Sequence, residues 1–145
     1  MMISIIGIVS VYAASRIGGG YANTAKYYQQ LMAQITYARK TAIAQRLPVC
    51  VHIAAGQSNV YYAGGGGTTC PASSGVMSPS GQAPFNVTAA SGTSVTAGTG
   101  NIMFDATGRY LTSAGATPGG PLTVTVSGEG TYNLTIEPET GYVHP

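Results

Sequence analysis

The stretch ITYARKTAIAQRLPVCVHI, residues 35 to 53, decides the expected fold because its periodicity changes partway along. Before Pro48 the apolar residues recur at steps of three and four, which is typical of one face of an α-helix. Pro48 ends this pattern, since proline cannot continue a helix interior. The next five residues, VCVHI, are a short apolar run that indicates a strand. The stretch therefore predicts a helix that passes directly into the first strand of a β-rich domain.

Toward the N-terminus the helical pattern reaches back to Tyr21. Most amide and charged side chains lie off its apolar positions, which are Tyr21, Ala25, Tyr28, Met32, Ile35, Ala38 and Ala42. The pattern predicts an amphipathic helix over residues 21–47. Gly18, Gly19 and Gly20 come immediately before it, and each would cost about 1 kcal/mol relative to alanine inside a helix. We expect the helix to bend, fray or stop at these three glycines.

The first fourteen residues, MMISIIGIVSVYAA, form a nearly continuous apolar run without a charged side chain. As a helix the run would span about 21 Å, which is less than the roughly 30 Å hydrocarbon core of a bilayer. By itself it fits the apolar part of a signal peptide, a buried helix or part of a membrane span. It has no basic region before it, so we expect a further segment upstream of residue 1.

Beyond the first strand the pattern is that of a β-rich domain. AAGQ supplies a turn, and the apolar run at residues 59–62 follows it, so the two runs predict a hairpin. Residues 64–100 are rich in glycine, serine and threonine and predict irregular loops, with weak strand candidates at residues 85–87 and 93–96. From residue 101 onward strands return, with period-two alternation at Leu122, Val124 and Val126 and at Tyr132, Leu134 and Ile136.

These elements predict an α+β protein, with a long N-terminal helix packed on an antiparallel β-sheet head. The chain has 145 residues, which suits one domain with a modest core. We expect two parts: an exposed apolar half of the helix over residues 1–20, and a head over residues 21–145. The head would combine the amphipathic helix with the β-rich residues 48–145.

Charge is unevenly distributed along the chain. Five of the six lysine and arginine residues precede residue 47, where no acid occurs, and they are Arg16, Lys26, Arg39, Lys40 and Arg46. The β-rich part has Arg109 against all four acids. A nucleic-acid-binding surface usually clusters cations on one folded face. We therefore do not expect nucleic acid as a partner.

Cys50 and Cys70 are the only cysteines of the chain. A bridge between them would stabilise the fold by roughly 3 kcal/mol in the chain-entropy model. It would also place the head outside the cytoplasm, where disulfides persist. The alternative is a pair of buried reduced thiols, but the apolar N-terminal run shows a route out of the cytoplasm and favours the bridge.

Residues capable of catalysis or metal binding are few. Cys50, His52, Cys70 and His144 are all ligand types, but they lack the paired spacing of a metal site, so we predict no metal. His52 is interpreted as a surface or strand-packing residue and His144 as an exposed tail residue. The four carboxylates are better explained by turns, Glu137 and Glu139 in EPETG and Asp105 in FDATG. The sequence therefore predicts no catalytic site and no cofactor.

The stretch MMISIIGIVSVYAASR resembles the hydrophobic N-terminal helix of type IV pilins and type II secretion pseudopilins, entered partway along. ITYARKTAIAQRLPVCVHI resembles the helix-to-strand passage of the minor pseudopilins of the GspH/FimT kind, and Ile102, Phe104 and Gly108 fit that family's terminal β pattern. The N-terminus is also similar to pilins of the mannose-sensitive haemagglutinin type. On this alignment roughly seven mature residues and the leader lie upstream. Where many members have a kinking proline this chain has Ser15.

The resemblance implies a structural subunit, a minor pilin or pseudopilin, that assembles with other pilin subunits and is not an enzyme. It implies a stay in the inner membrane with a periplasmic head, then entry into a pilus or pseudopilus, and methylation. Assembly and membrane contacts would come from Met1, Met2, Ile3, Ile5, Ile6, Ile8, Val9 and Val11. The alternatives are a major pilin that forms the filament body, or a DNA-binding minor pilin of the FimT kind.

Overall fold

The computed structural model describes residues 21–64, 70 and 74–145. The apolar N-terminal residues expected to make assembly contacts, and the flexibility expected at Gly18, Gly19 and Gly20, lie outside the described residues. So does the proposed division of the chain at residue 20.

Helix α2 spans Tyr21–Gln45 and is the one helix of the described residues. The sequence predicted that it would continue to residue 47. It stops two residues earlier because Arg46 adopts a left-handed backbone conformation, with φ 54°. Leu47 and Pro48 then lead into the first strand, as the change of periodicity predicts.

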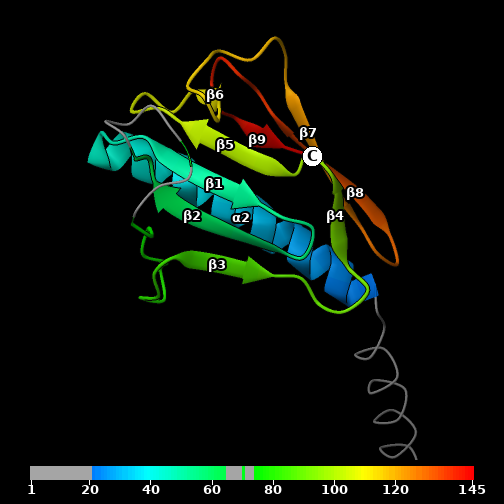
Figure 1. Cartoon of the computed structure of the whole chain (residues 1–145). Coiled ribbons are helices and arrows are strands. Elements are labelled where there is room, and N and C mark those ends of the chain that lie inside the picture. Colours follow the sequence, from blue (N-terminus) through cyan, green and yellow to red (C-terminus); the bar gives the residue numbers. More distant parts are fainter. Residues whose placement is uncertain (1–20, 65–69, 71–73) are drawn as a thin grey trace, which may run out of the picture.

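The strands form two antiparallel sheets (Figure 1). The first has the order β3-β2-β1-β5-β6, with β1 at Val49–Ile53, β2 at Gln57–Tyr62, β3 at Phe85–Thr88, β5 at Gly100–Phe104 and β6 at Tyr110–Thr112. The second has the order β4-β7-β8-β9, with β4 at Ser94–Ala97, β7 at Leu122–Ser127, β8 at Thr131–Ile136 and β9 at Val143–His144. The α+β arrangement predicted from the sequence is confirmed.

The β1–β2 and β7–β8 hairpins have the registers that their alternating apolar residues imply. Val51 pairs with Val60 in the first hairpin, and Val124 pairs with Leu134 in the second. All four side chains are buried. The weak candidates in the glycine-rich region also form strands, since β3 pairs with β2 and β4 pairs with β7.

The core lies between α2 and both sheets (Figure 1). Its fully buried members include Leu31 and Ile35 on α2, Phe104 on β5 and Leu134 on β8. Because α2 contacts strands of both sheets, it joins them into one domain.

The buried face of α2 is wider than the apolar pattern predicted. Its members are Thr24, Tyr27, Tyr28, Leu31, Gln34, Ile35, Ala38, Thr41 and Ala42. Ala25 and Met32, which belong to the expected apolar face, are only partly buried. Three buried positions carry polar side chains, so an apolar pattern alone could not locate them.

Gln34 is the largest of these buried polar side chains. Its Nε2 donates hydrogen bonds to the backbone oxygens of Ser58, at 3.2 Å, and Phe85, at 2.8 Å. The Ser58 hydroxyl donates a further hydrogen bond to Gln34 Oε1. One helical side chain thereby fastens α2 to both β2 and β3, and its desolvation is compensated by hydrogen bonds.

Candidate functional site along helix α2

The Cys50–Cys70 disulfide predicted from the sequence is confirmed, with the two Cα atoms 6.0 Å apart. It joins the second residue of β1 to the long connection between β2 and β3. The backbone N–H of Cys70 donates to Ser113 O at 3.4 Å, so this connection also contacts the segment after β6. The bridge closes a separation of 20 residues, for which the chain-entropy model gives roughly 3 kcal/mol.

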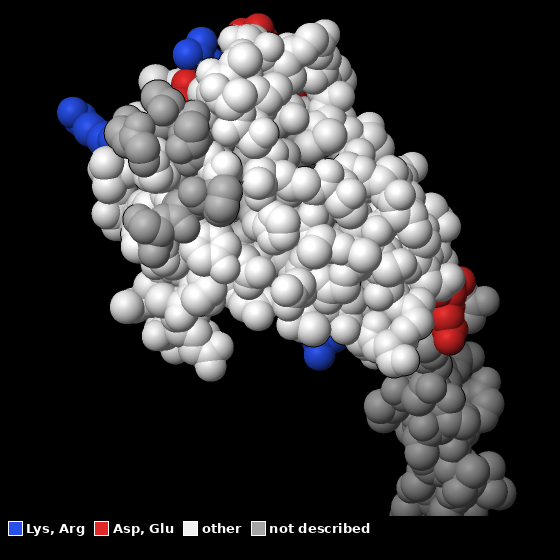
Figure 2. Space-filling view, viewed as in Figure 1, with Lys and Arg blue, Asp and Glu red and all other residues white. Residues whose placement is uncertain are grey.

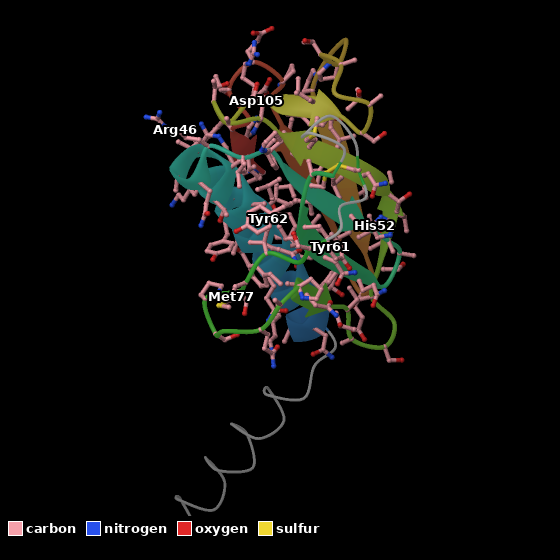
Figure 3. The ribbon with its side chains drawn as sticks, turned by 60° about the vertical axis from the view of Figure 1, so that its left-hand side comes forward. Arg46, His52, Tyr61, Tyr62, Met77 and Asp105 are labelled. Atoms are coloured by element: carbon pink, nitrogen blue, oxygen red, sulfur yellow. A yellow bond between two sulfur atoms is a disulfide. The ribbon has the colours of Figure 1, made fainter. Side chains whose placement is uncertain are left out.

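The two histidines have separate protein partners. His52 Nδ1 lies 2.6 Å from Asn101 Oδ1, across the β1–β5 pair. His144 Nε2 lies 3.0 Å from Glu137 Oε1. Figure 3 shows His52 at the right-hand side of the molecule, and it belongs to β1 of the first sheet. In the described part of the chain, no three ligand-type side chains gather into a group that could hold a metal ion.

The sequence interpretation of His144 as an exposed tail residue is wrong. His144 belongs to β9 and pairs with Thr135 of β8, and its side chain is 33% exposed. Tyr142 stacks on its ring at a centroid distance of 5.4 Å. The short strand places the imidazole beside Glu137, a contact that the position of His144 near the end of the sequence does not reveal.

The hydrogen bond to Glu137 raises the pKa of His144 above its ordinary value of 6.5, a bond to the Pro145 carbonyl adds to this, and desolvation opposes it. A raised pKa means that the contact stabilises the fold fully below about pH 6.5 and is lost as the pH rises through the raised value. We expect an NMR titration of His144 to give a pKa above 6.5, and Glu137→Gln to lower it. An unchanged pKa in that variant would contradict the assignment.

The acidic side chains expected in turns are found there. Asp105 Oδ1 accepts hydrogen bonds from the backbone N–H groups of Thr107, at 2.9 Å, and Arg109, at 3.0 Å, and Arg109 Nε binds Asp105 Oδ2 at 3.1 Å. Partial burial would raise the pKa of Asp105, but the hydrogen bond that the Thr107 hydroxyl donates to Oδ1 at 2.6 Å and the bonds just described outweigh it and lower the pKa. The Gly141 N–H donates to Glu137 O, which closes the EPETG turn.

The two turns meet beside α2. Arg39 Nε donates to the Gly108 carbonyl at 3.1 Å. A Cβ atom placed on Gly141 would lie 2.0 Å from the same carbonyl oxygen. Figure 3 shows Arg46 and Asp105 toward the end of the molecule where α2 finishes. The close approach of the two turns therefore leaves no room for a side chain at position 141.

Charged side chains are sparse on the face of the molecule seen in Figure 2: some lie together at the top, and the others lie singly near the edges among neutral residues. Arg109 is paired with Asp105, and Arg39 binds a backbone carbonyl. Lys26, Lys40 and Arg46 are exposed and belong to α2 or the residue that follows it.

A groove runs along the exposed side of α2. It consists of three adjoining hollows of about 150, 410 and 500 Å³. The first two share Lys26, Gln30 and Thr88, and the last two share Ala33 and Phe85. Ten residues of the helix line the hollows, and six of them follow one another along it: Asn23, Lys26, Gln30, Ala33, Tyr37 and Lys40. These residues are three or four positions apart, so they form one continuous stripe.

Strand β3 and the segment before it form the opposite wall of this α2–β3 groove. The middle hollow is lined by all four residues of β3, Phe85–Thr88. Side chains alternate between the faces of a strand, so consecutive lining residues mean that the hollow runs along the strand edge. Further along, Tyr37 contacts Phe85 edge to face, with ring centroids 5.4 Å apart, and its hydroxyl donates to Met77 O at 2.8 Å. Figure 3 shows Met77 on the loop before β3.

The sequence did not reveal this groove. Apart from Tyr37, the stripe on α2 contains charged, amide and alanine residues, which by themselves indicate an ordinary solvent-exposed face. Its character as a groove depends on β3, which follows β2 only after a long connection. The one local signal was the weak strand candidate at residues 85–87.

Within the described residues, no helix combines the length and apolar character needed to cross a membrane.

Comparison with known proteins gives one family and one fold. The family model of type II transport protein GspH matches residues 28–140. The type IV minor pilin FimU of Pseudomonas aeruginosa PAO1 has a similar structure in one crystal form, with a TM-score of 0.62 and 14% identity over 86% of this chain and 88% of that one. A second crystal form gives a TM-score of 0.56 and 16% identity over 83% and 90%. No curated protein matches the chain.

Proposed function

This chain belongs to the GspH family of type II transport proteins and is a structural subunit of the minor pilin or pseudopilin kind, and we propose that it enters its filament through its apolar N-terminal residues. The family model matches 28–140, most of the chain, and this membership is the observation on which the proposal rests. The role proposed is structural and not catalytic.

The distribution of apolar residues supports this route of assembly. The described core is built from α2 and both sheets, so the head has its own apolar interior. Residues 1–14 add a charge-free apolar run, MMISIIGIVSVYAA. Burying one such isoleucine, valine or methionine side chain is worth about 1.5–3 kcal/mol. We propose that these residues lie in the inner membrane before assembly and against neighbouring subunits afterwards.

The disulfide supports a head outside the cytoplasm, because such bridges form and persist in oxidising compartments. We propose a periplasmic head that later forms part of a pilus or pseudopilus. The partners proposed are other pilin or pseudopilin subunits, and no cofactor is required.

Deletion of residues 1–14 tests this function. We expect the shortened chain to keep a folded head, because the described core contains none of these residues. We also expect it to be absent from sheared surface filaments and pseudopili of cells that lack the intact subunit. Circular dichroism melting measures the fold, and immunoblotting of the sheared fraction measures incorporation. Normal incorporation of the shortened chain would refute the proposal.

A further inference from the structure

We propose that the α2–β3 groove binds an extended polypeptide segment that carries acidic side chains and belongs to a neighbouring subunit other than a second copy of this chain. The proposal deepens the function proposed above, since a filament subunit requires contacts with its neighbours. It concerns the head, however, and not the apolar N-terminal residues. Three features of the groove support it: an open strand edge, two lysines and their spacing.

The open strand edge is the first feature. In the first sheet β3 pairs with β2 alone. Just beyond β3, the N–H of Ala89 donates to Gly56 O at 2.9 Å. This bond shows which residues of β3 direct their N–H and C=O groups toward β2 and which direct them away. Because every second residue of an antiparallel pair faces the partner strand, Asn86 and Thr88 direct their N–H and C=O groups away from β2. Asn86 and Thr88 both line the middle hollow of the groove, and an added strand could pair with these groups.

The two lysines are the second feature. Lys26 lines the 150 and 410 Å³ hollows, and Lys40 lines the 500 Å³ hollow toward the other end of α2. Both are exposed, and neither forms a salt bridge with any acid among the described residues. None of the side chains that line the three hollows is acidic. The charge of the groove is therefore positive at both ends and complements an occupant with two carboxylates.

The spacing of the lysines defines the occupant. Lys26 and Lys40 are fourteen positions apart in one helix, which is about 21 Å at 1.5 Å per residue. An extended chain covers this distance in about six residues at 3.3 Å each. Acidic residues six positions apart lie on one face of a strand, since its side chains alternate. Between the lysines Ala33, Met32 and the Tyr37 ring, which contacts Phe85, provide an apolar surface over which small apolar side chains can lie.

The experiment uses a blocked peptide of seven residues, Glu-Thr-Val-Thr-Val-Thr-Glu, whose two valines share a face with the glutamates, titrated into the full chain in detergent micelles. Calorimetry measures the affinity, and NMR measures hydrogen exchange at the amides of Asn86 and Thr88. We expect binding that slows exchange at both amides. Reversing one charge, with Lys26→Glu or Lys40→Glu, should weaken the affinity about fivefold, in the range of exposed ion pairs. A peptide with lysine at both ends should not bind.

Two controls separate the contribution of the groove lysines from that of net charge, and the contribution of strand pairing from that of side-chain contacts. Arg46→Glu makes the same change of net charge outside the groove and should leave the affinity within about twofold. N-methylation of alternate peptide amides blocks strand pairing and should abolish binding. The proposal is overturned if the lysine peptide binds equally well, if N-methylation has no effect, or if Arg46→Glu weakens binding as much as Lys26→Glu.

Self-association provides the remaining outcome. If the chain dimerises without peptide, if Lys26→Glu abolishes the dimer, and if the peptide does not bind, then a second copy occupies the groove and the proposal is wrong. Peptide binding is measured on the isolated chain, whereas filament incorporation is measured in cells. Absent binding with normal incorporation of the intact chain therefore refutes this inference alone and leaves the function proposed above in place.

Discussion

Replacing Ile6 with lysine should reduce incorporation of the subunit into filaments at least tenfold while the head remains folded. Ile6 lies within a charge-free apolar run, and filament entry is proposed to bury that run against other subunits. An unpaired ammonium in apolar surroundings costs several kcal/mol even after the surroundings relax. Since about 1.4 kcal/mol corresponds to a factor of ten in an equilibrium constant, assembly should fail. Immunoblotting of sheared filaments measures the result.

Ile43→Lys is the matched control for this substitution. It makes the same chemical change, but Ile43 lies on α2 and its side chain is 41% exposed. A lysine there can place its ammonium in water, so incorporation should stay near that of the unaltered chain. If Ile6→Lys were incorporated normally, or if both variants failed equally, the apolar run would not be the assembly element.

The substitution Gly141→Ala should lower the free energy of unfolding of the head by about 3 kcal/mol. Gly141 has a φ of 64°, a left-handed conformation that costs a residue with a Cβ atom about 1–2 kcal/mol. In addition, its new Cβ would lie 2.0 Å from the Gly108 carbonyl oxygen. A backbone atom cannot rotate away as a side chain can, and relieving such overlap typically costs about 1–3 kcal/mol. Urea unfolding of residues 21–145 measures the loss.

Gly92→Ala separates these two costs. Gly92 also has a positive φ, 82°, but a Cβ atom added there would meet nothing within 4 Å. This variant should therefore lose only the conformational part, about 1–2 kcal/mol. Equal losses in the two variants would show that the approach of the EPETG turn to Gly108 does not limit the residue at position 141.

The features predicted correctly from the sequence are those encoded locally. The helix periodicity before Pro48, the alternation in β7 and β8, and the turn between β1 and β2 each lie within a few residues. The disulfide followed from the presence of only two cysteines and from the expected compartment. Such signals do not depend on which distant segments come together.

The features that were missed depend on distant partners. Gln34 interrupts an apolar face, and the carbonyl groups that bind it belong to residues 24 and 51 positions away. The division of the strands into two sheets depends equally on pairing across long connections, as for β1 and β5. The groove requires both α2 and β3, so neither segment alone could predict it. His144 was misinterpreted because β9 has only two residues and its partner Glu137 lies across a turn.

The two hydrogen bonds donated by Gln34 also determine the position of α2 along its own axis relative to the sheets. Apolar side chains tolerate sliding by a helical turn more readily than polar ones, because their attraction has no direction. A displacement of α2 by one turn, about 5.4 Å, would move the Gln34 amide away from the carbonyls of Ser58 and Phe85. These buried polar groups would then lack hydrogen-bond partners, which is unfavourable. The hydrogen bonds of Gln34 therefore fix the position of α2 along its axis relative to both sheets. The distance from the start of α2 to the β-sheets of the head is fixed as a result.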